Sequence, residues 1–225
     1  MNQPSLRQKL QQGKNVYGSC ITSTAPMWPK VIQQTGLDFV FLDTEHIPLD
    51  RAELARLCQQ FRAYGITPIV RIPSPDPFRA CQVIDGGAIG VVAPYLESVE
   101  QIQELVGATK FRPLKGERLA VYLTGQEEMS AEMKAYIDNF NANTICIANI
   151  ESVPALNRLD DLLSVPGLDA VFIGPMTYPL VWAYPSNTIT LILKPQFEAL
   201  FTKRGRKDSP LAFIFRWSRN VRFSG

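Results

Sequence analysis

Short runs rich in β-branched and aromatic residues alternate along this chain with longer stretches of helical pattern. About six or seven such runs lie between Val16 and Gly174. This is more strands than one half of a dinucleotide-binding fold contains, and fewer than the eight strands of a closed (β/α)8 barrel. Strands that alternate with helices pair in parallel and bury both faces of the sheet. The sequence therefore predicts an α/β fold. The clearest runs are VYGSCITST, FVFLDTEH, TPIVRIPS, IGVVAPYL, TICIANIES and DAVFIG.

The stretches between these runs carry the signals that begin and end helices. Side chains that can accept a hydrogen bond from the first helical turn precede several of them. These predicted caps are Asp50, Asp76 before Pro77, Ser98 with Gln101, and Ser152. The pair Gly86-Gly87 is predicted to end a helix, because no G-x-G-x-x-G spacing supports phosphate binding. We interpret Tyr95 as a packing residue.

Composition excludes several classes of protein. A hydrophobic content of 46% is enough for a full core, and a formal net charge of +2 argues against a nucleic acid or a membrane surface as partner. No apolar run approaches the ~18 residues of a membrane span, and the polar start MNQPSLRQKLQQGK lacks the apolar core of a signal peptide, so we expect a cytoplasmic protein. The cysteines are predicted to be reduced, since they form no C-x-x-C pair: Cys20, Cys58, Cys81 and Cys146.

The alternating pattern stops after Pro175. In residues 176–225 charge gathers in KRGRKD, no helical period emerges, and only Leu211 to Phe215 resembles a strand. We therefore predict an incomplete (β/α)8 barrel over residues 1–175 and an atypical tail over residues 176–225. An unclosed barrel would leave strand edges unpaired.

Polar side chains gather where the apolar runs end. In a parallel fold these carboxyl ends converge on one face, so residues distant in sequence can form one pocket. The set holds carboxylates for a hard divalent cation, an imidazole for proton transfer and a guanidinium for an anionic oxygen. Its members are Asp43, Glu45, His46, Arg71, Asn149 and Glu151, with Asp85 placed just before the next strand.

Each of these residues also has a structural interpretation. His46, the sole histidine, could be an ordinary surface or core residue. Arg71 could pair with Asp43 or Asp85, and Glu151 could cap the helix that follows it. The joint occurrence of these groups at successive strand ends favours the functional interpretation.

A set of ordered motifs resembles the HpcH/HpaI aldolase family. The resemblance runs from about Leu6 to Pro175. It implies a (β/α)8 barrel, a homo-oligomer, a divalent cation (Mg²⁺ or Mn²⁺, with Co²⁺ or Zn²⁺ as alternatives), and cleavage of 4-hydroxy-2-oxo acids to pyruvate and an aldehyde, as in aromatic compound catabolism. The motifs are DTEHIPLDR, PIVRIPSPDP, DGGAIGVVAPY, RPLKGER, IANIES and GLDAVFIGP.

The resemblance also implies a role for each polar residue. His46 would be the acid/base group, with Asp85 as its orienting partner. Arg71 would hold the pyruvate oxygens, Glu151 would ligate the metal, and Asp43 would lie near the aldehyde or a metal-bound water. A cation that draws off the negative charge of the enolate makes a lysine Schiff base unnecessary.

The chain departs from the family pattern just after Gly174 and Pro175, whose backbone would bind the substrate carboxylate. Where the family has a second metal-ligating aspartate, this chain has Thr177. Back-translation of Met176 to Pro179 gives ATG ACN TAY CCN, and moving the frame one base upstream forces an aspartate codon, GAC. We therefore hypothesise that the tail from Met176 is out of frame, and that the chain as written has little activity.

Two alternatives to a metal-dependent aldolase stay open at this point. One is a carbon–carbon lyase acting on a CoA ester, like the citrate lyase β-subunit, although no CoA-binding surface is recognisable. The other is an inactive, truncated remnant, which the absence of an aspartate at Thr177 favours.

Overall fold

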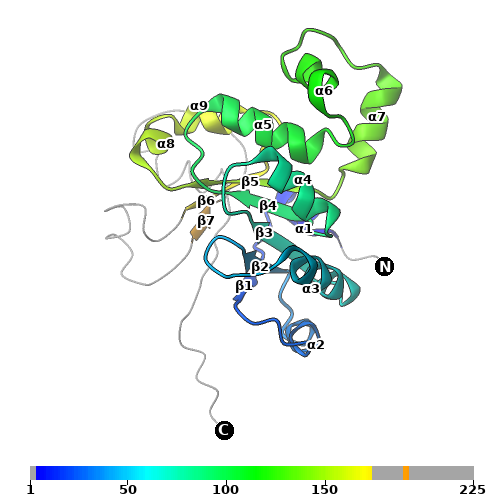
Figure 1. The fold of residues 1–225 in the computed structure, drawn as a ribbon, viewed down its shortest axis with the longest axis vertical. Coiled ribbons are helices and arrows are strands. Elements are labelled where there is room, and N and C mark those ends of the chain that lie inside the picture. Colours follow the sequence, from blue (N-terminus) through cyan, green and yellow to red (C-terminus); the bar gives the residue numbers. More distant parts are fainter. Residues whose placement is uncertain (1–3, 174–189, 193–225) are drawn as a thin grey trace.

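The computed structural model describes residues 4–173 and 190–192, and within them the strands form one sheet in chain order, β1-β2-β3-β4-β5-β6-β7 (Figure 1). The strands from β1 to β6 pair in parallel. The α/β prediction is therefore confirmed, and each of the six runs quoted above contains a strand. Their bounds are β1 Gly18–Ile21, β2 Phe39–Asp43, β3 Thr67–Arg71, β4 Gly90–Ala93, β5 Ile145–Ile150 and β6 Ala170–Ile173.

The sheet curls so that strands far apart in its order face each other. The rings of Phe41 on β2 and Phe172 on β6 stack with centroids 5.6 Å apart, although three strands lie between them in the sheet. A flat sheet would hold these strands well beyond ring contact, because neighbouring strands are about 4.8 Å apart. The described strands thus form a curled, incomplete barrel wall with an inner face.

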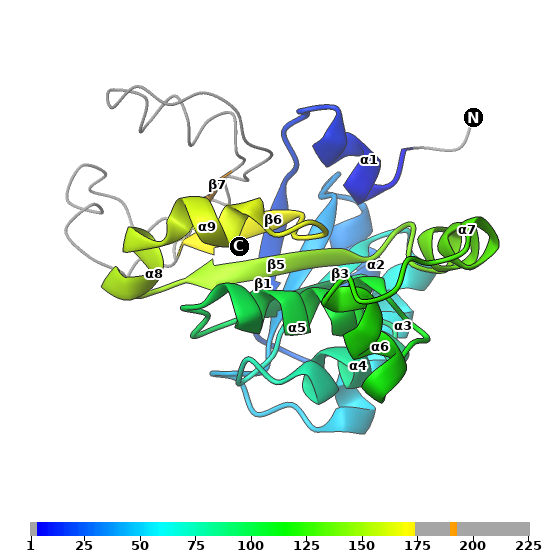
Figure 2. The same cartoon turned by 90° about the horizontal axis from the view of Figure 1, so that it is seen from above.

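Helices cover the outer side of this wall. Helices α3, α4 and α5 each pack against the strand that follows them, and α6 and α7 lie at the end of the molecule away from β6 and β7 (Figures 1 and 2). None of the helices in the described ranges is long and apolar enough to cross a membrane. The bounds are α1 Leu6–Gln11, α2 Trp28–Gln33, α3 Arg51–Ala63, α4 Pro77–Asp85, α5 Val99–Lys110, α6 Gly116–Leu123, α7 Ala131–Phe140, α8 Val153–Asn157 and α9 Leu159–Ser164.

The predicted helix caps are confirmed. Each cap side chain accepts a backbone N–H of the first turn, which satisfies a donor that the helix itself leaves unpaired. The caps are Asp50 for α3, Asp76 for α4, Ser98 for α5 with Gln101 completing a capping box, and Ser152 for α8. Gly87, with a φ of 112°, ends α4 in a conformation that side chains disfavour.

The strand after β6 was not predicted. β7, Thr190–Ile192, pairs antiparallel with β6, whereas a regular (β/α)8 barrel has parallel strands throughout. A three-residue strand is too short to show a period in sequence, so its partner decides its structure. The strand predicted at residues 211–215, and almost all of the tail proposed to be out of frame, lie outside the described residues.

A partly buried ionic network ties the N-terminal helix to the amino edge of the sheet. Asp169, just before β6, accepts the Arg7 Nε–H at 3.1 Å and the Cys146 N–H at 2.8 Å, and it also pairs with Lys110. Burial lowers the pKa of Lys110, and the Asp169 charge opposes that shift. The network holds α1 in place while Leu6 and Leu10 fill the core.

Candidate active site

The carboxyl ends of β2, β3 and β5 bring three charged side chains together on the inner face of the curled sheet. Asp43 and Arg71 are the last residues of β2 and β3, and they are register partners. Glu151 follows β5 directly. Side chains alternate along a strand, so Asp43 shares the inner face with Phe41 two residues before it. The predicted convergence of strand-end polar groups is therefore found for these residues.

Arg71 and Asp43 form a bidentate ion pair. Arg71 Nε donates to Asp43 Oδ1 at 2.9 Å, and Nη2 donates to Oδ2. Both residues are buried, at 8% and 6% exposure, and the guanidinium also lies over the Phe41 ring. Burial acts to lower the pKa of Arg71, but the hydrogen bonds and charge of Asp43 raise it above its usual value. Arg71 is thus a fixed, permanent cation.

The remaining nitrogen of Arg71 faces two further carboxylates. Its Nη1 lies 3.1 Å from Glu45 Oε2 and 4.0 Å from Glu151 Oε1. Burial raises the pKa of Glu151, and the Glu45 charge adds to this, which shows that the two carboxylates repel each other. Glu151 does not cap α8, since Ser152 does. One guanidinium therefore stands among three carboxylates.

Tyr95 contributes to the cluster in a way that the sequence did not reveal. Its hydroxyl donates to Glu45 Oε1, and its ring is 55% exposed, so it is not the packing residue we expected. Its φ of 56° is unusual for a side chain other than glycine and marks the turn after β4 as constrained. The hydrogen bond to Glu45 raises the pKa of the Tyr95 phenol, so Tyr95 remains a donor.

His46 lies at the mouth of the cluster. Its side chain is 67% exposed, and Nε2 is 3.9 Å from Glu45 Oε2. Its backbone N–H points to Asp43 Oδ1 at 3.4 Å, as does that of Glu45 at 3.1 Å. The turn after β2 is therefore folded around the Asp43 carboxylate, and it leaves the imidazole open to solvent.

Asn149 is a fully buried amide on β5, two residues before Glu151 and on the same face of the strand. Within the described part of the chain, neither its Nδ2 nor its Oδ1 has a hydrogen-bond partner. A buried amide without partners is costly in a folded protein. The amide does lie close enough to Glu151 to lower the pKa of that carboxylate, although no well-aligned hydrogen bond joins the two side chains.

Asp85 does not join this cluster. It is the last residue of α4, which runs back toward the amino edge of the sheet, and its exposed carboxylate pairs with Arg112. The expectation that it lies beside His46 is not met within the chain, because a residue just before a strand starts from the opposite edge to the site.

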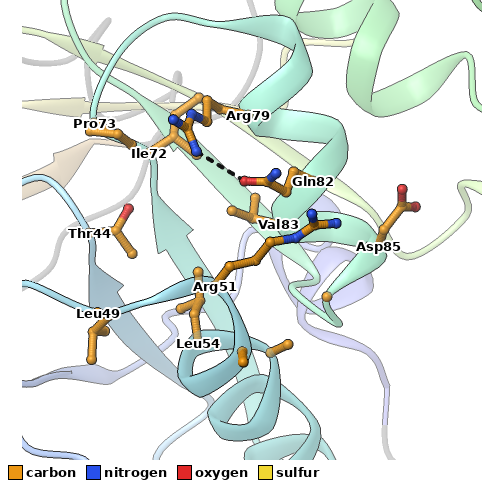
Figure 3. Close-up of a pocket in the computed structure, with 13 residues that line it drawn as sticks. Thr44, Leu49, Arg51, Leu54, Ile72, Pro73, Arg79, Gln82, Val83 and Asp85 are labelled. Atoms are coloured by element: carbon orange, nitrogen blue, oxygen red, sulfur yellow. Dashed lines mark hydrogen bonds between the residues drawn. The ribbon is translucent and has the colours of Figure 1, made fainter.

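Asp85 instead lines an outer groove between α3 and α4 of about 490 Å³ (Figure 3). Thr44 and Ile72 line the same groove and follow Asp43 and Arg71 in the sequence, so their side chains point away from the cluster. Figure 3 shows Thr44 and Asp85 at opposite ends of this groove. The groove and the charged cluster are separate features.

The cluster suits a hard divalent cation. Glu45 Oε2 and Glu151 Oε2 are buried oxygens without hydrogen-bond partners in the described ranges. Mg²⁺ and similar ions take carboxylate oxygens, commonly one or two, and complete their shell with water and substrate. No group of three acidic, histidine or cysteine side chains in residues 4–173 and 190–192 is arranged to hold a metal. Two carboxylates are therefore the donors that the described chain offers.

Comparison with known proteins identifies the family. The model of the HpcH/HpaI aldolase/citrate lyase family matches residues 20–184. The chain belongs to this family. The predicted resemblance is thus confirmed, although the family name covers aldolases and citrate lyases alike.

Two proteins named as aldolases share moderate identity with the chain. A 2-dehydro-3,6-dideoxy-6-sulfogluconate aldolase of Pseudomonas putida is 30% identical over 158 residues, which are 70% of this chain and 61% of that protein. A hydroxypyruvate/pyruvate aldolase of Roseobacter denitrificans is 27% identical and covers 91% of the chain, which spans 78% of it. Both are carbon–carbon lyases by name, which supports lyase activity by resemblance.

A solved HpcH/HpaI aldolase from Desulfitobacterium hafniense has a similar fold. It superposes with a TM-score of 0.67 at 25% identity and covers 95% of this chain and 90% of its own. This similarity supports the incomplete barrel as a variant of the family fold. A homo-oligomeric assembly stays a prediction.

Proposed function

We propose that the protein is a metal-dependent aldolase that cleaves 4-hydroxy-2-oxo acids to pyruvate and an aldehyde. The observation that carries this proposal is the Arg71 guanidinium, fixed by Asp43 and facing two carboxylates with unsatisfied oxygens. Such a site can bind an anionic oxo acid and a cation together, which one guanidinium or one carboxylate alone could not do.

Arg71 would bind the oxo-acid end of the substrate. Its Nη1 has only long or poorly aligned contacts, whereas Nε and Nη2 are taken by Asp43. A fixed cation stabilises the negative charge that develops on the pyruvate oxygen as the carbon–carbon bond breaks. Asn149, which is buried and makes no well-aligned hydrogen bond among the described residues, would donate to the same end. Gly174 and Pro175 lie outside the described residues, and their role stays a prediction.

His46 would move the proton. Cleavage begins when a base takes the proton from the 4-hydroxyl group, the C3–C4 bond breaks, and the aldehyde leaves. The electron pair then passes to the C2 oxygen, and the proton returns to C3 to give pyruvate. His46 is exposed at the mouth, where the aldehyde end would lie, and Glu45 is near enough to orient the imidazolium. Asp85 has no part in this proposal.

Glu151 would hold the cation, which when bound polarises the keto oxygen as a Lewis acid. Two carboxylates with one guanidinium between them leave the site negative. The cation would therefore offset the burial and the Glu45 charge, which together raise the pKa of Glu151.

Pyruvate release tests the proposal. The purified chain is incubated with a series of 4-hydroxy-2-oxo acids, with Mn²⁺ and after chelation, and pyruvate is measured by coupled reduction with lactate dehydrogenase. We expect slow release with Mn²⁺, since the chain lacks the aspartate at Thr177, and loss of that release with chelator. His46→Ala should lower turnover by about 10²–10⁴-fold, the usual contribution of proton transfer. Arg158→Ala, an exposed residue of the same edge, is the control.

Two outcomes would contradict the proposal. Metal-independent turnover would remove the role of Glu151 as a metal ligand, and unchanged turnover in His46→Ala would remove His46 from the chemistry. A folded protein that releases no pyruvate from any substrate, judged by a cooperative melt, would favour the inactive remnant.

A further inference from the structure

The position where the family pattern has a second aspartate ligand holds Thr177 in this chain. If Glu151 were the single protein ligand, a divalent cation would be held weakly, because Mg²⁺ and Mn²⁺ are dehydrated reluctantly and rely on charged oxygens. A second carboxylate near Glu151 would strengthen the binding of the cation.

Glu45 is near Glu151. Both carboxylates contact the same nitrogen, Arg71 Nη1, at 3.1 Å and 4.0 Å. Each has an Oε2 atom that is buried and, among the described residues, without a hydrogen-bond partner. The 3.1 Å contact of Glu45 Oε2 with Arg71 thus brings charges together without hydrogen-bond alignment. Two buried carboxylate oxygens without a well-aligned hydrogen bond can accept a cation, and the nearby Tyr95 and Asn149 groups offset only part of the effect of burial on the pKa of Glu151.

Glu45 is also held in position by its other contacts. Its backbone N–H donates to Asp43 Oδ1 at 3.1 Å, and its Oε1 accepts the Tyr95 hydroxyl. Tyr95 therefore takes up one oxygen of the carboxylate and leaves the other for a ligand. Outer contacts of this kind orient the ligands in known metal sites.

The net charge of the described cluster also favours a bound cation. Asp43, Glu45 and Glu151 carry three negative charges when ionised, and Arg71 carries one positive charge that is used mainly by Asp43. Glu45 and Glu151 are left to share a single nitrogen. A divalent cation between them would neutralise the excess without disturbing the Arg71–Asp43 pair.

We propose that Glu45 is the second carboxylate ligand of the divalent cation, beside Glu151, in place of the aspartate absent at Thr177. This inference rests on the proposed function, since it assumes that the site takes a metal. The cation probed is Mn²⁺, whose binding can be measured without turnover.

The test is electron–nuclear double resonance on Mn²⁺ bound to the chain labelled with δ-¹³C-glutamate. A ligating carboxylate carbon couples strongly to Mn²⁺, whereas a carboxylate that acts through water does not. We expect two strong ¹³C couplings in the wild type and one in each of Glu45→Gln and Glu151→Gln. Removal of outer contacts costs roughly 10- to 100-fold in metal affinity, so loss of a direct ligand should weaken Mn²⁺ binding at least that much.

Glu97→Gln serves as the matched control, because Glu97 is exposed in the turn after β4 and outside the cluster. It should keep both couplings and the wild-type affinity. Thermal melts in chelator show whether each variant is folded.

The outcomes separate the two proposals. Mn²⁺ binding with a single strong coupling, lost in Glu151→Gln and kept in Glu45→Gln, would overturn the role of Glu45 and leave the aldolase proposal standing. A folded wild-type chain that binds no Mn²⁺ would overturn both.

Discussion

Arg71 donates hydrogen bonds to Asp43 from Nε and Nη2, and its third nitrogen, Nη1, faces Glu45 and Glu151. The pair joins the ends of two adjacent strands, so its geometry is set by the sheet and not by a loop. A guanidinium fixed in this way loses little entropy when it binds a substrate oxygen.

Asp43→Asn should destabilise the protein by about 3 kcal/mol, because removal of one partner leaves the other charge of a buried pair poorly compensated. Glu45 and Glu151 keep the cost at the low end of the usual range. Urea unfolding followed by circular dichroism measures the change. Asp138→Asn is the control, since its pair with Lys134 is exposed and worth well under about 1 kcal/mol. Equal effects of the two variants would contradict this prediction.

Gly18→Ala should destabilise the protein by about 1–3 kcal/mol, the usual cost of overpacking. A Cβ atom at Gly18 would lie 2.4 Å from the Phe39 ring on the neighbouring strand, and Phe39 is buried. Ser19→Ala on the same strand should change the free energy of unfolding far less. Phe39→Leu should recover part of the loss in the Gly18→Ala background, and an absence of any such coupling would show that the ring is not the obstacle.

Stability should fall on the alkaline side because of buried thiols. Burial raises the pKa of Cys58 and of Cys146 to about 12, from an ordinary value of 9.0. Between these values the folded state keeps protons that the unfolded state has lost, so the free energy of unfolding decreases as pH rises. Each thiol contributes a slope of about 1.4 kcal/mol per pH unit. Urea unfolding between roughly pH 9 and 10.5 should therefore show a smaller slope in Cys58→Ala/Cys146→Ala, and parallel slopes would refute the assignment.

Glu151→Gln should stabilise the metal-free protein at neutral pH. Burial and the Glu45 charge raise the pKa of Glu151, so its ionised form is favoured more in the unfolded than in the folded state. The wild type should therefore lose stability as pH rises from the unfolded value, near 4.5, through the folded pKa, and the variant should not show this loss. Melting temperatures in chelator between pH 4 and 7 measure the difference. A variant that melts below the wild type at pH 7 would contradict the prediction.

Much of the fold and part of the site could be predicted from the sequence. Parallel strands place their carboxyl ends on one edge, so Asp43, Arg71 and Glu151 could be grouped by their positions alone. Asp50 and Ser98 each accept a hydrogen bond from a backbone N–H three residues later, so the sequence shows both the cap and the helical turn that it caps. These features depend on local order and on one general rule of topology.

Other features depend on contacts that local sequence does not encode. Asp85 is the last residue of a helix and precedes a strand, so only the direction of α4 shows that it belongs to the opposite edge. The Tyr95–Glu45 hydrogen bond spans 50 residues and needs a turn with a positive φ at Tyr95. The antiparallel direction of β7 is set by its pairing with β6, and a sequence of three residues does not indicate strand direction.

The contact between Arg7 and Asp169 has a consequence for how the chain is made. The two residues are 162 positions apart, so α1 leaves the ribosome long before its anchor has been translated. Lys9 on the same helix pairs with Asp38, so α1 can make its first contact early, whereas the Arg7–Asp169 contact can form only after the sixth strand has been translated. The first helix is therefore fully anchored only late in biosynthesis.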